Sequence, residues 1–361
     1  MNLTRRELGR LAAAGTMLGY APRAIASGEE RKIGYAVIGL GVISMEHFMP
    51  GVKMSQHSRI TGIVSGHRDK AERIAAQYGV PSGSIYSYED CDRMADNKDI
   101  DAVYVALPNN MHAEYTIRSA KAGKHVLCEK PMATSVADCE AMIAACRNAD
   151  RKLMIAYRCH LEPTNLHAMQ ILREGKLGKI QAIESSFGFH AAPGQWRLSR
   201  TMAGGGPLMD VGIYSLNACR YLTGEEPVSV EAYSSVVDKD GRFAEVEENV
   251  SWTMEFPSGA VASCSTTYGA PMMGFFKVHG AMGEMYAEPA FNYDGMHLRA
   301  EIYGQPPIDE LNPARDPYQF VAEADHFAEC VLENREPVTP GEEGLRDMKL
   351  IAEIYRTSGI R

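Results

Sequence analysis

The sequence lacks several features that would place it in a specialised class. No apolar run among its 361 residues reaches the roughly 20 residues that a membrane-spanning helix needs. Lys and Arg number 37 against 46 Asp and Glu, the net charge is -9, and no basic run follows the first residues. We therefore expect neither a membrane nor a nucleic acid among its partners. With 45% hydrophobic residues, the chain can form two domains with cores of their own.

The cysteines do not follow the spacing of a metal site. None belongs to a Cys-x-x-Cys pair, and no His pair accompanies them at zinc spacing, so we expect no structural metal. Most lie in apolar surroundings, which is typical of small core residues with free thiols. The eight positions are Cys91, Cys128, Cys139, Cys146, Cys159, Cys219, Cys264 and Cys330.

The first 26 residues have the three parts of an export signal. Arg5 and Arg6 supply the charge, residues 11–18 form a mildly apolar core, and Ala-Ile-Ala at 24–26 fits a cleavage site. This order predicts a twin-arginine signal peptide over residues 1–26 and a periplasmic protein that is exported already folded. An amphipathic N-terminal arm of a cytoplasmic protein is the alternative.

Residues 27–157 alternate short apolar strands with amphipathic helices, which predicts a doubly wound parallel sheet that binds a dinucleotide. The expected strands are 33–40, 59–65, 102–107, 125–128 and 153–156, and the expected helices are 45–54, 69–78, 112–122 and 136–149.

Residues 158–361 change to longer alternating stretches, which predict an α+β domain with a mostly antiparallel sheet that leaves one face open. We expect the open face to support a homo-oligomer, and the two last helices to pack back on the first domain. The expected strands are 180–189, 228–237, 250–256, 260–267 and 275–279, and the expected helices are 163–174, 320–333 and 341–355.

A glycine-rich turn marks the nucleotide site. Gly39-x-Gly41-x-x-Ser44 follows a strand and precedes a helix, where glycines let the backbone approach a pyrophosphate and the helix N-terminus supplies free N–H groups. An ordinary turn is the alternative, since the third glycine is replaced by serine.

The end of the next strand favours NADP over NAD. The carboxylate that binds the ribose of NAD is absent there, whereas Ser65, Arg68 and Lys70 offer a hydroxyl and two cations to a 2′-phosphate. The alternative is a solvated turn with Asp69 as a helix cap.

Lys130, Asp210 and Tyr214 form the candidate catalytic group. Oxidising a sugar hydroxyl needs a base, and a Tyr with a pKa of about 10 becomes one only beside a cation. Lys130 lies at the carboxyl end of a strand, where ligands bind. Asp210 precedes Tyr214 by one helical turn and would orient Lys130. The alternatives are a surface Lys and a core Tyr, and either Lys130 or Tyr214 could be the proton acceptor.

Several short segments resemble sequences of the Gfo/Idh/MocA family, and within it those of the glucose–fructose oxidoreductase branch. The resemblance extends over nearly the whole chain. The segments are Leu-Pro-Asn-x-x-His at 107–112, Cys-Glu-Lys-Pro at 128–131, Lys-Leu-Met-Ile-Ala-Tyr-Arg-Cys-His at 152–160, Gln-Trp-Arg at 195–197, Gly-Gly-Gly-Pro-Leu-Met-Asp-Val-Gly-Ile-Tyr at 204–214, Tyr-Leu-Thr-Gly-Glu-Glu-Pro at 221–227 and Pro-Gly-Glu-Glu-Gly at 340–344. Tyr214 matches that branch, whereas many family members have His there.

The resemblance implies a Rossmann domain followed by an open-faced α/β domain, with a sugar between them beside a tightly bound NADP. The chain lacks part of that branch's C-terminal extension, so we expect a dimer rather than a tetramer. The implied cofactor contacts are Gly39, Gly41, Val42, Ile43, Ser65, Gly66, His67, Arg68, Lys70, Tyr88, Ala106, Leu107, Pro108, Asn109, His112, Glu129, Lys130, Arg158, Trp196 and Arg197. The implied substrate contacts are Lys130, Arg158, Asp210 and Tyr214.

The expected function is an exported oxidoreductase that oxidises an aldose to its lactone and reduces a second aldose or ketose to an alditol in a ping-pong cycle. The alternatives are an NAD-dependent glycoside hydrolase, a sugar dehydrogenase with exchangeable NADP, and a sugar-sensing binder. His112 and His160 stay ambiguous, because each could be a hydrogen-bonded structural residue.

Overall fold

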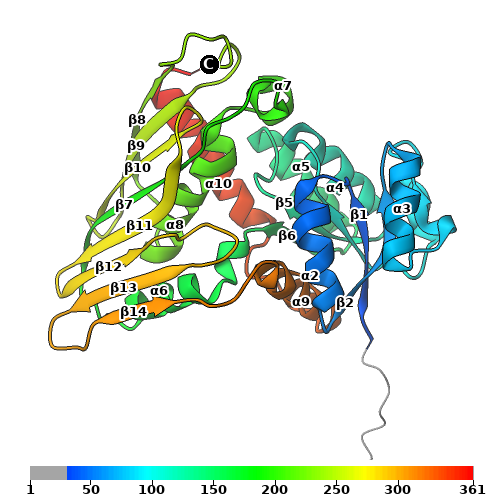
Figure 1. The fold of residues 1–361 in the computed structure, drawn as a ribbon, viewed down its shortest axis with the longest axis horizontal. Coiled ribbons are helices and arrows are strands. Elements are labelled where there is room, and N and C mark those ends of the chain that lie inside the picture. Colours follow the sequence, from blue (N-terminus) through cyan, green and yellow to red (C-terminus); the bar gives the residue numbers. More distant parts are fainter. Residues whose placement is uncertain (1–30, 361) are drawn as a thin grey trace, which may run out of the picture. The chain divides into compact units, whose positions relative to one another are not determined.

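The first sheet is parallel and six-stranded, and the computed structural model describes it within residues 31–360. The predicted leader, residues 1–26, lies outside the described residues. The strands, in the order β3-β2-β1-β4-β5-β6, are β1 (Ile33–Ile38), β2 (Ser58–Val64), β3 (Ile85–Tyr86), β4 (Ala102–Val105), β5 (His125–Glu129) and β6 (Leu153–Ala156). This order belongs to dinucleotide-binding sheets and confirms the predicted doubly wound architecture (Figure 1).

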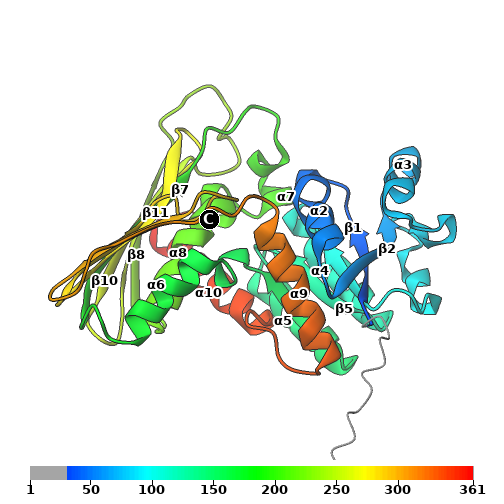
Figure 2. The ribbon, with the colours of Figure 1, turned by 60° about the horizontal axis from the view of Figure 1, so that its bottom comes forward.

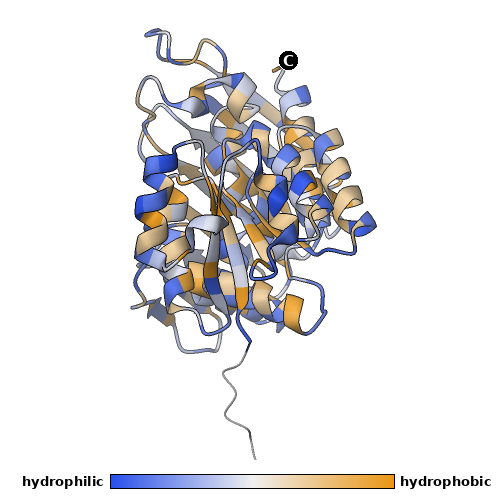
Figure 3. Cartoon of the chain, turned by 90° about the vertical axis from the view of Figure 1, so that its right-hand side faces the viewer, coloured by the Kyte–Doolittle hydropathy of each residue, from blue (hydrophilic) through white to orange (hydrophobic). Residues whose placement is uncertain are grey.

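Helices cover both faces of this sheet because its strands are apolar on both sides. All six residues of β1 are buried; Tyr35 and Val37 belong to one core cluster, and Ala36 and Ile38 to another. The helices are α2 (Met49–Met54), α3 (Arg68–Tyr78), α4 (His112–Lys121) and α5 (Val136–Asn148). Figure 3 looks onto this layer and shows hydrophobic residues along the strands and hydrophilic ones scattered over the outer helices. A strand buried on both faces is typical of a parallel sheet.

The second sheet has eight strands, and only the β7–β10 pair is parallel. In the order β14-β13-β12-β11-β7-β10-β9-β8, the strands are β7 (Ile180–Gly188), β8 (Ser229–Ser235), β9 (Asn249–Glu255), β10 (Val261–Thr267), β11 (Met272–Gly280), β12 (Gly283–Ala287), β13 (His297–Ile302) and β14 (Ile308–Leu311). The helices of this half are α6 (Pro163–Arg173), α7 (Arg200–Ala203), α8 (Ile213–Thr223), α9 (Tyr318–Leu332) and α10 (Gly341–Thr357).

One face of the second sheet carries helices and the other is open. Figure 2 shows α6 and α8 on the same side of the sheet. On the opposite face, alternate residues of β8, β9 and β10 such as Glu231, Thr253 and Ser263 are exposed. Because apolar and polar residues alternate along each strand, this sheet buries one side only, which confirms the predicted open-faced domain.

The two last helices connect the halves of the described chain. Helix α9 packs against α2, β1 and β2, as the sequence predicts for both terminal helices. Helix α10 contacts α5 and β6 of the first half, but it also contacts α8 and β8 of the second half. Helix α8 also carries the catalytic candidate Tyr214.

The prediction that the cysteines are small core residues with free thiols is confirmed, since all eight side chains are buried and unpaired. Within residues 31–360, no cluster of His, Cys, Asp and Glu has the arrangement of a metal site. No helix in this part of the chain combines the length and apolarity that crossing a membrane would require.

Candidate functional site

A cavity of about 1090 Å³ lies at the carboxyl ends of the first sheet's strands and extends to the second domain. It has the size and position expected of a nucleotide site in a doubly wound fold. Of the predicted cofactor and substrate residues, those in its wall are Gly39, Gly41, Val42, Ile43, Ser65, His67, Lys70, Tyr88, Ala106, Leu107, Pro108, Asn109, His112, Glu129, Lys130, Arg158, Trp196, Arg197, Asp210 and Tyr214.

Two predicted cofactor residues are not part of the cavity wall. The guanidinium of Arg68 pairs with Glu72 at 2.7 Å and donates to the carbonyl oxygen of Ile85 at 3.1 Å. Gly66 lies against the ring of Tyr88, where an added Cβ would meet ring carbons at 3.1 Å. The positive charge that the sequence assigns to Arg68 is therefore turned toward a neighbouring helix residue.

The glycine-rich turn has the backbone that close approach to a ligand requires. Gly39 has φ +97°, and a Cβ there would lie 2.3 Å from the carbonyl oxygen of Ala106. Gly41 is exposed in the cavity wall, and a Cβ on it would meet nothing within 4 Å. Ser44 donates from Oγ to the carbonyl oxygen of Gly39 at 2.7 Å, which closes the turn. These residues fit a pyrophosphate beside the helix N-terminus.

The end of β2 presents polar groups to the same cavity. Ser65, His67 and Lys70 are in its wall, and Lys70 Nζ donates to the carbonyl oxygen of Leu40 at 2.6 Å. Lys70 therefore holds its charge beside the glycine-rich turn. A hydroxyl, an imidazole and an ammonium fit a 2′-phosphate better than the bare hydroxyls of NAD.

Asp210 is the centre of the catalytic group. Lys130, directly after β5, donates from Nζ to the carbonyl oxygen of Asp210 at 2.6 Å and to Oδ1 at 3.2 Å. Arg197 Nε donates to Oδ2 at 2.7 Å, and the hydroxyl of Tyr268 donates to Oδ2 at 2.9 Å. Burial alone would raise the pKa of Asp210, but the charges of Arg197 and Lys130 outweigh it and hold this pKa well below its usual value.

Tyr214 lies in the first turn of α8, and the preceding π-helical segment Leu208–Gly212 carries Asp210. Lys130 Nζ is 4.8 Å from the centre of the Tyr214 ring, and the Arg158 guanidinium is 5.1 Å from it. Burial raises the pKa of Tyr214, and the charge of Arg158 offsets this only in part. Tyr214 is therefore a neutral phenol at rest. It can accept a proton from a substrate only while it passes its own hydroxyl proton to another group.

The two ambiguous histidines have different surroundings. His112 is buried, with Nε2 and Nδ1 each 2.9 Å from a carbonyl oxygen, of Leu107 and Pro131 respectively. It connects the end of β4 to the segment after Lys130 and is part of the cavity wall. His160 Nε2 lies 2.7 Å from Asn217 Oδ1, and His160 is not in that wall.

Several residues of the cavity wall were missed by the sequence analysis. The segment 291–294 contributes Tyr293, whose ring lies 4.6 Å from the Arg158 guanidinium. Glu323 of α9 is fully buried, and neither of its carboxylate oxygens has a hydrogen-bond partner among residues 31–360. Burial and the negative charge of Glu129 raise the pKa of Glu323. No motif marks these positions, because only the folded chain brings them to the cavity.

Two family models match this chain. An oxidoreductase family with an NAD-binding Rossmann fold matches residues 33–157, and the GFO/IDH/MocA C-terminal domain matches residues 165–286. Among curated proteins, the D-xylose 1-dehydrogenase (NADP(+)) of Haloarcula marismortui is 32% identical over 91% of this chain and 92% of its own length.

Solved structures include similar folds over most of the chain. The aldose-aldose oxidoreductase from Caulobacter crescentus, complexed with glycerol, has a TM-score of 0.88 and 47% identity, covering 91% of this chain and 98% of that one. A 3-ketoreductase from Actinomadura kijaniata, in complex with TDP-benzene and NADP, has a TM-score of 0.77 and 26% identity with the same coverage.

Proposed function

The chain belongs to the Gfo/Idh/MocA oxidoreductase family, and on that premise we propose that it is an exported sugar oxidoreductase with tightly bound NADP. One aldose is oxidised to its lactone, and a second aldose or a ketose is then reduced to an alditol in the same cavity. The observation that carries the proposal is the group of Lys130, Asp210 and Tyr214 in the wall of the cavity that contains the glycine-rich turn. The similarity to an aldose-aldose oxidoreductase supports it.

Bound NADP supplies the hydride acceptor and, once reduced, the hydride donor. The backbone at Gly39 and Gly41 would hold its pyrophosphate, and Ser65 and Lys70 would bind its 2′-phosphate. The name of the haloarchaeal relative, which includes NADP, supports this choice of cofactor. A nucleotide that stays bound explains how such an enzyme works after export, since the second sugar regenerates it.

Lys130 and Tyr214 would exchange the proton of the reacting sugar hydroxyl. Lys130 has two hydrogen bonds to Asp210, so its ammonium is held in place facing the Tyr214 ring. The Asp210 carboxylate remains ionised at neutral pH because of its lowered pKa and keeps the cationic Lys130 and Arg197 oriented.

The test is the absorbance spectrum and nucleotide content of the protein purified without added cofactor. We expect one NADP for each chain, a near-ultraviolet NADPH band that grows with an aldose, and loss of that band when a second sugar is added. Release of NAD rather than NADP on denaturation would contradict the cofactor assignment. A protein without nucleotide that turns over only with added NADP would be a dehydrogenase with exchangeable cofactor, a function that the D-xylose 1-dehydrogenase relative favours.

A further inference from the structure

A second, small cavity lies behind the catalytic group. Its volume is about 10 Å³, close to the minimum that holds one water molecule. Lys130 and Tyr214 line this cavity as well as the large one, so they separate the two. The other residues of its wall are Tyr157, Cys159, Ile213, Asn217 and Tyr221.

The hydroxyl of Tyr157 needs a partner in this cavity. Tyr157 follows β6 directly, and its buried hydroxyl has no hydrogen bond of regular geometry among residues 31–360. The Asp347 carboxylate is the group that this hydroxyl approaches, and their contact acts on the pKa of both residues. A buried polar group without a partner costs about 1–3 kcal/mol, so a water that bonds to it is favoured. Tyr221 lines the same cavity, but its hydroxyl already donates to Asn165 Oδ1 at 3.0 Å.

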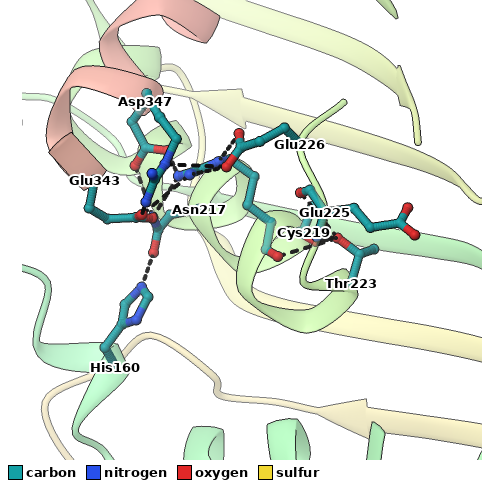
Figure 4. Close-up of polar contacts among 10 residues, drawn as sticks. His160, Asn217, Cys219, Thr223, Glu225, Glu226, Glu343 and Asp347 are labelled. Carbon is teal, nitrogen blue, oxygen red and sulfur yellow. Dashed lines mark hydrogen bonds and ion pairs between the residues drawn. The ribbon is translucent and has the colours of Figure 1, made fainter. Parts of the chain in front are cut away.

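A buried ionic cluster joins α8 to α10 (Figure 4). Arg220 Nη1 donates to Asp347 Oδ1 at 2.5 Å and to Glu343 Oε1 at 2.7 Å. Asn217 Nδ2 donates to the same two carboxylates, and its amide oxygen lies 2.7 Å from His160 Nε2. The two carboxylates of α10 therefore share the same two donors of α8.

The two carboxylates of this cluster titrate differently. Burial raises the pKa of Asp347 to about 6, although the charge of Arg220 opposes the shift, and the charge of Glu343 adds to it. Burial would also raise the pKa of Glu343, but Arg220 outweighs it and lowers this pKa to about 2. Asp347 acts on Tyr157, whose pKa is raised first by burial, then by the charge of Asp347 and by the hydrogen bond between the two side chains. Asp347 can therefore take up and release a proton near neutral pH.

We propose that one water in the small cavity joins Lys130 and Tyr214 to Tyr157. Through this relay, the proton of the reacting sugar hydroxyl reaches Asp347 in the first half-reaction and returns in the second. The inference rests on the proposed two-sugar cycle, in which the first half-reaction releases one proton and the second consumes one. Because Asp347 stores the released proton, the second half-reaction receives the same proton, and none has to be exchanged with solvent through the sugar cavity.

Each proton transfer along this relay breaks one bond to hydrogen and forms another. As the sugar hydroxyl gives its proton to the Lys130–Tyr214 pair, the pair releases one of its own to the water, the water releases one to Tyr157, and Tyr157 releases its hydroxyl proton to the Asp347 carboxylate. Only the sugar hydroxyl and Asp347 differ in protonation state before and after the transfer. No electrons move through the relay, since the hydride goes to the nucleotide. The second half-reaction reverses every step.

The pair Tyr157→Phe and Tyr221→Phe tests the relay, because both rings line the cavity and, of the two hydroxyls, that of Tyr157 approaches Asp347. Nucleotide reduction by an aldose and reoxidation by a second sugar are measured separately in rapid mixing across pH. In the wild type, reduction needs ionised Asp347 and should rise with pH through about 6. Reoxidation needs its protonated form and should fall over the same range.

We expect Tyr157→Phe to slow both half-reactions by roughly ten- to a hundredfold, on the scale of general acid–base effects, and to remove both inflections. Tyr221→Phe should keep both. A second readout is the infrared difference spectrum between oxidised and reduced holoenzyme, where a protonated carboxyl band should appear in the wild type and be lost in Asp347→Asn.

Wild-type rates and inflections in Tyr157→Phe would overturn the relay, and so would a high-resolution crystal structure without water in the small cavity. A wild-type protein that no aldose reduces would instead contradict the proposed function. The crystallographic result does not depend on activity, so the two failures are distinguishable.

Discussion

Asp210 accepts hydrogen bonds from three side chains, those of Lys130, Arg197 and Tyr268, which come from three separate segments. Two of these donors are cations, so the Asp210 carboxylate neutralises charge at a place from which water is largely excluded. Its replacement would leave both cations without their counter-charge, which is more costly than the loss of the hydrogen bonds alone.

We expect Asp210→Asn to lower the free energy of unfolding by about 3 kcal/mol at neutral pH, because the amide keeps the shape but not the charge. The folded pKa of Asp210 lies below its unfolded value of about 3.9, so this stabilisation is complete above pH 4 and is lost as the pH falls through the folded pKa. Urea unfolding from pH 2 to pH 7 should show the difference between the two proteins shrinking in acid.

Tyr268→Phe is the matched control for Asp210→Asn. It removes one neutral donor to the carboxylate and should cost about 1 kcal/mol, while most of the pH dependence stays, because Arg197 and Lys130 lower the pKa of Asp210 more than Tyr268 does. A destabilisation in Asp210→Asn that stays constant over the whole pH range would show that the charge of Asp210 is not what stabilises the site.

Among the elements, helices were easier to predict than the short strands of the second half. The predicted helix 136–149 is observed as α5, which begins after the Ser135 cap and buries Cys139, Met142 and Cys146 at helical spacing. Strands β12, β13 and β14 were missed, although β13 alternates buried and exposed residues along its six positions. Strand β3 has two residues, too few for any period.

The glycine-rich turn provides a test at the scale of one element. In Gly39→Ala, the new Cβ would lie 2.3 Å from the carbonyl oxygen of Ala106 at a φ of +97°, so the turn must shift from the position that it has beside the cavity. We expect purified Gly39→Ala to contain at least tenfold less NADP than the wild type, on the scale of about 1.4 kcal/mol or more in binding. The nucleotide released on denaturation is the measurement.

Gly79→Ala controls for backbone strain without a clash. Gly79 ends α3 with φ +68°, and a Cβ there would meet nothing within 4 Å. This variant should lose about 1 kcal/mol of stability and retain its nucleotide. Equal nucleotide content in Gly39→Ala and the wild type would mean that the turn does not bind the cofactor.

At the scale of the whole molecule, the sequence predicted the half of the site that lies on continuous motifs. Lys130 ends a strand and Tyr214 follows a glycine-rich run, so each is visible locally. Tyr293 and Glu323 come from segments that reach the cavity only after α9 packs back on the first sheet. Their part in the site depends on tertiary contacts, which a single sequence does not encode as a period or a spacing.

The open face of the second sheet leads to a prediction about assembly. Glu184, Thr253 and Ser263 lie in neighbouring register on β7, β9 and β10, and all three are exposed. An open sheet face is a surface through which two copies can pair, and a twofold axis would then bring the same face of both subunits together. We therefore expect a dimer through this face.

Ser263→Glu places a second negative charge beside Glu184 on this face of each subunit, so it should shift the wild-type dimer toward monomer by at least tenfold in Kd. Size-exclusion chromatography with light scattering over a dilution series measures this shift. Ser82→Glu makes the same change at an exposed position of the first domain and should leave the dimer intact. If the wild type is monomeric, or if Ser263→Glu dimerises as the wild type does, this face is not the interface.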